Sequence, residues 1–135
     1  MARLEVHVVA PEREVFTGEA DMVVAKGTEG DVGILPGHAP MLVRLAIHPV
    51  RLLEGGQVRE TILVDGGFLH VTPGEDEEAT RVDVLADHAA LPGEIDAAAA
   101  RSRVDELRRR AEETGEVGAQ ADLAKALMRA EHGGG

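Results

Sequence analysis

Residues 30–40 of the chain read Gly30-Asp31-Val32-Gly33-Ile34-Leu35-Pro36-Gly37-His38-Ala39-Pro40. Glycine permits backbone conformations that are closed to other residues, whereas each proline fixes its own φ angle and restricts the residue before it. Three glycines and two prolines around a short apolar core therefore predict turns on both sides of a minimal strand. We expect this segment to hold a single loop shape and to present Asp31 and His38 from it.

Outward from this segment, the chain up to about Ala90 has the pattern of short strands separated by turns. Leu4, Val6 and Val8 alternate with polar residues, which is the period of a strand with one buried face. Strands that recur at short, turn-punctuated spacing predict an all-β sandwich or barrel. Further strands are expected at 22–25, 32–35, 41–46, 50–53, 61–64, 68–72 and 82–85, with turns at 27, 30, 36–37, 49, 55–56, 66–67 and 73–74.

An acidic run, Glu75-Asp76-Glu77-Glu78, follows one of these strands. We expect it to form a solvated hairpin tip. A carboxylate cluster that binds calcium is the alternative, but the aspartate spacing and the glycine of a calcium-binding loop are missing.

The period of the sequence changes after residues 91–93. Asp96 stands where a carboxylate favours the start of a helix, and Asp105 with Arg109 and Glu106 with Arg110 are spaced as i,i+4 ion pairs. Two glycines within residues 114–118 are expected to break this helix before a second one. The apolar stripes are Ala97, Ala100, Val104, Leu107 and Ala111 in the first helix, and Ala119, Leu123, Ala126 or Leu127, and Ala130 in the second.

The two helices are predicted to form an antiparallel αα-hairpin, because the segment between them is short. Their stripes consist mostly of alanine, which buries little apolar area, and short helices are marginal by themselves in water. We therefore expect a weakly held hairpin that can detach and dock again, which is a property suited to a switch.

Composition limits the classes of function. The net charge of −11 over 135 residues argues against a nucleic-acid ligand, because phosphate binding needs a basic surface. The chain has no cysteine, and its six histidines are scattered rather than paired at metal-ligand spacing, so we expect no metal site. The absence of G-x-S-x-G, H-E-x-x-H and Gly-Lys-[Ser/Thr] motifs argues against an enzyme.

Nothing in the sequence predicts a direct membrane anchor. The first six residues lack a signal-peptide pattern, and no apolar run approaches the roughly 20 residues that span a bilayer. We expect a protein of the cytoplasm that reaches a membrane only through a partner.

Several segments together resemble the epsilon subunit of bacterial F-type (rotary) ATP synthases. Residues 30–40 resemble the G-x-G-I-x-P-G-H-A-P loop of that family. Two further segments resemble its G-G-[FIV]-x-x-V strand pair and the V-L-A-D-x-A that closes its sandwich: Val64-Asp65-Gly66-Gly67-Phe68-Leu69-His70-Val71 and Val84-Leu85-Ala86-Asp87-His88-Ala89. Its two C-terminal helices are matched by Glu94-Ile95-Asp96 with the alanine-rich helix, and by Ala121-Asp122-Leu123-Ala124-Lys125-Ala126.

The resemblance implies a fold that is mainly β plus α. A β-sandwich of about ten strands over residues 1–89 would bind the gamma subunit and the c ring, and a regulatory two-helix hairpin would occupy residues 90–135. It also implies a non-catalytic central-stalk rotor subunit, which couples the c ring and gamma to the catalytic head of alpha and beta subunits. The hairpin would restrain ATP hydrolysis, and the protein would lie peripherally at the cytoplasmic face of the bacterial plasma membrane through the complex.

In this family the glycine–proline loop faces the c ring, which makes Asp31 and His38 candidates for contact with the polar loops of c subunits. An acidic group at Asp31 would pair with basic loop residues. The alternative for His38 is structural: its ring would cap the loop by hydrogen bonding to the backbone.

The resemblance also gives the basic residues of the hairpin a partner, an acidic segment of the catalytic beta subunit. The alternative is that they pair with the hairpin's own carboxylates at Asp105, Glu106, Glu112 and Asp122, and most surface ion pairs have no further role. The contiguous run 108–110 favours the partner contact. The candidates are Arg103, Arg108, Arg109, Arg110, Lys125 and Arg129.

Some bacterial members bind ATP through an [IL]-D-x-x-R-A motif at the start of the first helix. This chain keeps Ile95, Asp96 and Ala100, but Ala99 stands where the arginine belongs, and a phosphate site without that guanidinium loses a bidentate donor. Asp96 and Arg101 remain as candidate nucleotide contacts, although Arg101 belongs to a different helix face. The pattern therefore argues against ATP as a regulatory ligand, and no cofactor is expected.

A generic β-sandwich adaptor, which binds a protein partner through its helical hairpin, is the rival class. Co-purification distinguishes the two classes, because a rotor subunit must bind gamma and an unrelated adaptor would not.

Overall fold

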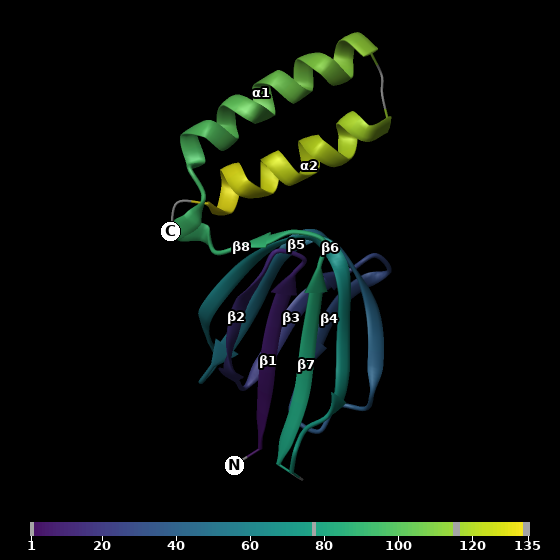
Figure 1. The fold of residues 1–135 in the computed structure, drawn as a ribbon, viewed down its shortest axis with the longest axis vertical. Coiled ribbons are helices and arrows are strands. Elements are labelled where there is room, and N and C mark those ends of the chain that lie inside the picture. Colours follow the sequence, from purple (N-terminus) through teal and green to yellow (C-terminus); the bar gives the residue numbers. More distant parts are fainter. Residues whose placement is uncertain (1, 77, 115–116, 134–135) are drawn as a thin grey trace. The chain divides into compact units, whose positions relative to one another are not determined.

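A computed structural model describes residues 2–76, 78–114 and 117–133, with only the helical backbone described for 111–114 and 117–120. The chain divides into two compact units, Met1–Ala89 and Ala90–Gly135. The first unit is built of strands and the second of helices (Figure 1). Within the described residues, neither helix combines the length and the apolar character that crossing a bilayer requires.

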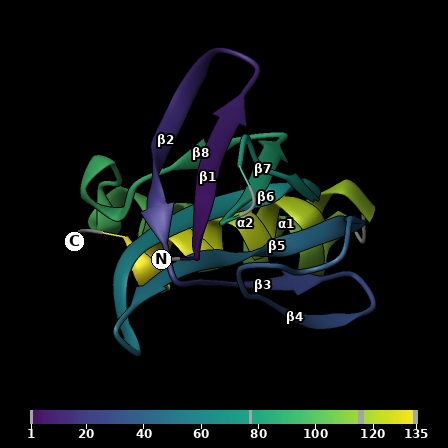
Figure 2. The ribbon, with the colours of Figure 1, turned by 90° about the horizontal axis from the view of Figure 1, so that it is seen from below.

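Eight strands form one sheet in the described part of the chain, in the order β2-β1-β7-β6-β5-β3-β4, with β8 beside β6. The β1 and β7 strands are parallel, whereas the other pairs of known register are antiparallel. The sheet curls so that β3 and β4 lie across the interior from β1 and β2 (Figure 2). The strands are β1 (Arg3–Ala10), β2 (Arg13–Ala20), β3 (Met22–Gly27), β4 (Gly30–Ile34), β5 (Met41–Glu54), β6 (Gln57–Pro73), β7 (Ala79–Ala86) and β8 (Ala89–Ala90).

The interior is aliphatic, and the alternation predicted for the first strand is confirmed. Leu4, Val6 and Val8 of β1 are completely buried, while the residues between them are partly exposed. Opposing strands supply side chains of the same kind. They include Val23, Ile34, Leu45, Leu52, Ile62, Leu69, Val71, Val82 and Val84.

The prediction of about ten strands is wrong, because two expected turns lie inside long strands. Pro49 lies within β5, opposite Leu63 of β6, at a place where the pairing of β5 with β3 is interrupted. A proline fits there because it has no backbone N–H to donate to a neighbouring strand. Gly66 and Gly67 lie within β6, where they bend the strand without ending it. Dividing β5 and β6 at these points would turn the eight strands into ten.

The β2 strand was not predicted. It lies at one edge of the sheet and pairs only with β1. Only Val15 and Ala20 of this strand are buried, so its sequence does not alternate clearly. An edge strand with one partner needs fewer apolar residues than a central one, which explains the weak signal.

Gly67 is the most constrained glycine of the sheet. Its φ angle is +122°, and a Cβ atom placed on it would lie 2.1 Å from the carbonyl oxygen of Leu85. Pairing of Gly67 with Leu45 on one side and Ala86 on the other fixes this position. The bend of β6 therefore requires glycine both for its backbone angle and for its close contact with β7.

We expect Gly67→Ala to destabilise the sandwich by at least about 2 kcal/mol, because the new methyl group meets backbone atoms that cannot move separately from the sheet. Gly33→Ala is the matched control, since a Cβ there meets only the terminal methyl group of Met22. Urea unfolding of both variants measures the difference. Equal stability of the two variants would contradict the proposed constraint.

The acidic run forms the connection between β6 and β7, as predicted, and Glu77 lies outside the described residues. The Glu78 N–H donates to Asp76 Oδ1 at 2.9 Å, and Arg3 Nη2 donates to Asp76 Oδ2 at 3.3 Å. The Glu78 hydrogen bond, followed by that of Arg3, holds the pKa of the Asp76 carboxyl below its usual range. The tip is thereby tied to the first strand.

The Asp76 interactions predict a dependence of stability on pH. A carboxyl whose pKa is lower in the folded state contributes stability above its unfolded pKa of about 4, and this contribution is lost as pH falls through the folded pKa. We therefore expect Asp76→Asn to lower the free energy of unfolding at pH 7, with the difference from the unaltered chain shrinking below about pH 4. Denaturant unfolding from pH 7 to pH 2.5 measures this, with Glu12→Gln as a control in another exposed turn. A difference that stays constant over this range would rule out the linkage.

The second unit contains a short 3-10 turn, Pro92–Glu94, and the helices α1 (Ala97–Thr114) and α2 (Val117–His132). Asp96 caps α1 as predicted, because its Oδ1 accepts the Ala99 N–H at 3.0 Å. Val104 and Leu107 of α1 pack with Ala126 of α2, and the two helices run side by side in opposite directions (Figure 1). The predicted break at residues 114–118 includes 115–116, which lie outside the described residues, as do the side chains of Ala111, Glu112 and Ala119.

Candidate interaction surfaces

The glycine–proline loop is fixed by hydrogen bonds at its turn. The Gly37 N–H donates to the buried Oγ1 of Thr80 on β7 at 2.7 Å, and the His38 N–H donates to the Leu35 carbonyl at 3.1 Å. Gly37 has a φ angle of +85°, which favours glycine at this position. The turn predicted at residues 36–37 is therefore confirmed, and β7 holds the loop that follows β4.

His38 makes the backbone contact expected of a loop-capping residue. Its Nδ1 lies 2.7 Å from the carbonyl oxygen of Ala39, which assigns the ring proton to Nδ1. The ring is half-buried and its Nε2 remains for other contacts. The capping role is thus present, and contact with the c ring stays a prediction.

Asp31 lies apart from this loop, because it is at the start of β4 and the loop follows the end of β4. It is exposed on β4, opposite Lys26 of β3, and borders a depression of about 290 Å³ with Lys26, His48 and Arg51. Among residues 2–76 no hydrogen bond or ion pair joins Asp31 to His38. The structure therefore does not combine the two predicted residues into one site.

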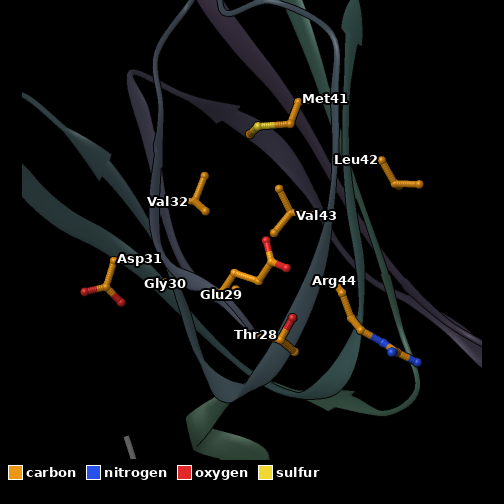
Figure 3. Close-up of a pocket in the computed structure, with 10 residues that line it drawn as sticks. Thr28, Glu29, Gly30, Asp31, Val32, Met41, Leu42, Val43 and Arg44 are labelled. Carbon is orange, nitrogen blue, oxygen red and sulfur yellow. The ribbon is translucent and has the colours of Figure 1, made fainter.

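A larger cleft of about 560 Å³ lies between the tip of the β3–β4 hairpin and the start of β5. Val32, Met41 and Val43 extend into it from opposite sides, and the Glu29 side chain reaches toward Val43 (Figure 3). Leu42, Arg44 and Asp31 also border the cleft, but their side chains point away from it. The cleft thus combines three apolar side chains and one inward carboxylate in a lining that is more polar than apolar.

Glu29 is not among the residues predicted from the sequence. The only signal was its position at the turn between Gly27 and Gly30, which pair with each other. A residue in so short a turn projects from the hairpin, but the sequence does not show that the start of β5 faces it.

An apolar row crosses the outer face of the sheet. Val9 pairs with Leu85, Leu85 pairs with Phe68, and these side chains are 36%, 51% and 43% exposed. Leu42, the most exposed of the large apolar residues at 65%, lies on the next strand, two residues before the Arg44 that pairs with Phe68. We call Val9, Leu42, Phe68 and Leu85 the outer apolar row. Apolar side chains that gather in this way on a surface mark a binding site more often than single ones do.

The basic residues of the hairpin do not form one cluster. Arg103 and Arg110 lie on either side of Glu106, at 3.0 Å and 3.8 Å, so the pair predicted between Glu106 and Arg110 is confirmed. The described residues contain no ion pair between Asp105 and Arg109. Residues 108, 109 and 110 project in directions about 100° apart around the helix axis, so their run in sequence is not a single patch in space.

A small cleft of about 240 Å³ lies at the start of α1. Asp96, Ala99, Arg103 and Arg129 line it, and Arg101 does not. Of the two predicted nucleotide contacts, Asp96 therefore lines this cleft and Arg101 does not. The arginines that line it are Arg103 and Arg129. Asp96 already accepts a helix N–H, and Arg103 already pairs with Glu106.

Lys125 lies on α2 one turn before Arg129, outside the lining of this cleft.

Within residues 2–76, 78–114 and 117–133, no group of three or more His, Cys, Asp or Glu side chains is arranged to hold a metal ion.

A curled sheet followed by a helical hairpin defines a β-sandwich protein with a C-terminal pair of helices. Residues 3–92 match the model of the ATP synthase, Delta/Epsilon chain, beta-sandwich domain, and the chain belongs to this family. The resemblance inferred from the sequence is thereby confirmed.

Relatives extend this similarity over the helical unit. The chain is 42% identical over 132 residues to the ATP synthase epsilon chain of Thermobifida fusca, covering 95% of this chain and 91% of the relative. It is 40% identical over 128 residues to that of Bordetella parapertussis, covering 92% and 87%.

Solved structures share the fold. The Euglena gracilis mitochondrial ATP synthase, in a structure of OSCP, F1 and c-ring, contains a chain with a TM-score of 0.72 and 18% identity, covering 97% of this chain and 80% of that one. A chain in the central stalk and c-ring of the Tetrahymena thermophila mitochondrial enzyme gives a TM-score of 0.52 at 16% identity, covering 95% and 94%. At these identities the likeness concerns the fold alone.

Proposed function

We propose that this chain is the non-catalytic epsilon subunit of a bacterial F-type ATP synthase, a rotor subunit of the central stalk. The observation that carries the proposal is its match to epsilon chains over both the sandwich and the hairpin, at about 40% identity. In this role it couples the c ring and the gamma subunit to the alpha and beta subunits of the catalytic head. It lies at the cytoplasmic face of the plasma membrane through the complex.

The outer apolar row is the surface that we assign to gamma. A rotor subunit needs a stable contact that persists through every turn, and buried apolar area supplies most of the free energy of such contacts. The row provides one of the two phenylalanines of the chain and three aliphatic side chains on adjacent strands. Arg44 and the ion pair of Arg81 with Asp83 give the row a polar border.

The end of the sandwich that carries the glycine–proline loop is the part that we assign to the c ring. Its loop is held by Thr80 and carries the half-buried His38, whereas the exposed Asp31 lies at the other end of β4. A rigid surface transmits torque without the loss of conformational entropy that ordering a mobile loop would require.

The helical hairpin is assigned a regulatory role. The core of the hairpin consists of few side chains, and its alanines bury little apolar area. Separating the helices from a surface on which they are docked therefore costs little free energy. Arg108, Arg109 and Lys125 have no ion pair among the described residues, which leaves them for an acidic segment of a beta subunit.

Replacing Phe68 and Leu85 together with serine in the full chain is expected to weaken binding to gamma at least tenfold. Burying one such side chain contributes about 1.5–3 kcal/mol, and a tenfold change in affinity corresponds to about 1.4 kcal/mol. Calorimetric titration of purified gamma with each variant measures the affinity.

Val58→Ser is the control for this experiment. Val58 is 51% exposed on the same strand, but it lies beside the β5–β6 turn and not in the outer apolar row. If gamma binds the unaltered chain and the double variant equally well, its interface is not the outer apolar row. Failure of the unaltered chain to bind gamma would favour a generic adaptor.

We further propose that ATP does not act as a regulatory ligand of this hairpin. Ala99 offers no guanidinium to the cleft at the start of α1, and the Asp96 carboxylate would repel a polyphosphate. Calorimetry with Mg-ATP is expected to show no binding at millimolar concentration. Binding at or below a millimolar dissociation constant that Asp96→Ala abolishes would overturn this prediction, and Arg103→Gln and Arg129→Gln would then identify the phosphate contacts.

A further inference from the structure

The depression of about 290 Å³ beside β3 and β5 gathers three basic residues. Lys26 comes from β3, whereas His48 and Arg51 come from β5. We call this depression, which Asp31 also borders, the basic depression. Acidic residues outnumber lysine and arginine by 25 to 14 in the chain, so the basic depression differs in charge from the rest of the protein.

The basic depression forms where β3 and β5 separate. Their pairing is irregular between Val24 and Gly27, and Pro49, which lines the depression, has no backbone N–H with which to bridge the gap. Val24 pairs with Arg51 at the edge of this interruption. The positions of these side chains are therefore set by strand pairing and not by a free loop.

The two permanent cations of the basic depression are not neutralised by the protein. Lys26 lies opposite Asp31 in the pairing of β3 with β4. Among the described residues, however, neither Lys26 nor Arg51 makes an ion pair or a side-chain hydrogen bond. Arg51 and His48 are half-buried, and charges that are partly withdrawn from water interact more strongly with a bound anion.

The basic depression also offers hydrogen-bond acceptors. His48 Nδ1 lies 3.0 Å from the carbonyl oxygen of Pro49, which assigns the ring proton to Nδ1 and leaves Nε2 as an acceptor. The Asp31 side chain points away from the larger cleft (Figure 3) and borders the basic depression. A suitable ligand therefore accepts hydrogen bonds from the two cations and donates one to the carboxylate or the imidazole.

We infer that the basic depression binds inorganic phosphate as its hydrogen phosphate ion. The ionised oxygens accept hydrogen bonds from Lys26 and Arg51, whose guanidinium can hold two of them, and the P–O–H group donates to Asp31. Sulfate has the same shape but no proton to donate at neutral pH. Phosphodiesters and the fully ionised phosphates of Mg-ATP lack this proton as well. The inference goes beyond the proposed function and does not rest on it, because every residue involved belongs to the sandwich unit.

Titration of the full-length, ¹⁵N-labelled chain with sodium phosphate at neutral pH and constant ionic strength tests the inference. We expect saturable shifts of the amide signals of residues 24–26, 48, 50 and 51, with a millimolar dissociation constant. Sodium sulfate is expected to bind at least about tenfold more weakly, because it meets the Asp31 carboxylate without a proton. Shifts that do not saturate with phosphate, or equal binding of the two ions, would overturn the inference.

Arg51→Gln removes the guanidinium but keeps a polar side chain, so we expect phosphate affinity to fall at least about tenfold. Arg59→Gln is the matched control, because it removes the same charge from an exposed arginine that pairs with Glu54 outside the depression. An equal loss in both variants would indicate a response to net charge alone and contradict a site. Urea unfolding checks the fold of each variant, and Lys26→Gln, at an exposed position, repeats the test if Arg51→Gln is destabilised.

Asp31→Asn tests the role of the phosphate proton. The new amide can donate to a sulfate oxygen and no longer repels it, so we expect sulfate to bind this variant within about threefold of phosphate. If the variant keeps the preference for phosphate, selection through Asp31 is wrong.

Vesicles distinguish free phosphate from the phosphate of a lipid headgroup. Phosphatidylglycerol is a phosphodiester, and the net charge of −11 repels an anionic surface, so we expect no flotation of the chain with phosphatidylglycerol vesicles. Vesicle binding that Arg51→Gln abolishes, without binding of free phosphate, would overturn the inference in favour of a lipid. Because binding to gamma is measured separately, failure of this inference leaves the proposed function standing.

Discussion

The close contact between Gly67 of β6 and the Leu85 carbonyl of β7 is the constraint on which the sandwich depends. A strand that runs through both layers of a curled sheet must bend sharply while its pairing continues on both sides. The positive φ angles of Gly66 and Gly67 provide this bend, and the missing side chain lets β7 approach. Pro49 lies on the neighbouring long strand, where pairing with β3 is interrupted. The sheet therefore closes over its aliphatic core without being divided into two separate sheets.

This bend and the interruption beside Pro49 also place the surfaces that we assign to binding. Phe68 follows Gly67 in the chain and pairs with Leu85 of β7. These two residues form the centre of the outer apolar row on the outer face. Where β5 separates from β3, the basic depression forms. Alternate residues of each strand fill the core. The residues between them face outward and are available for binding.

The two units differ in how much apolar area holds them together. Leucine, isoleucine and valine fill the sandwich from all sides, whereas the described core of the hairpin centres on Val104, Leu107 and Ala126. Because stabilisation scales with buried apolar area, we expect the sandwich to be the rigid part and the hairpin to rearrange at lower cost. This division suits the proposed role, in which the sandwich transmits rotation and the hairpin responds to a regulatory state.

The local features of this protein could be predicted from its residues alone. Period-2 alternation placed β1, the 3- and 4-residue spacing placed both helices, and the position of Asp96 identified the cap of α1, because each depends on residues close together in the chain. The family motifs identified the class of protein for the same reason. Features that depend on register between distant segments became visible only in the folded chain. It showed that β5 and β6 continue through Pro49 and Gly66-Gly67, and it separated Asp31 from His38. It also brought Glu29 to face Val43 and aligned Val9, Leu85 and Phe68 in one row. Such contacts arise from pairing between strands far apart in sequence, and a residue's own neighbours do not encode which distant strand will lie beside it.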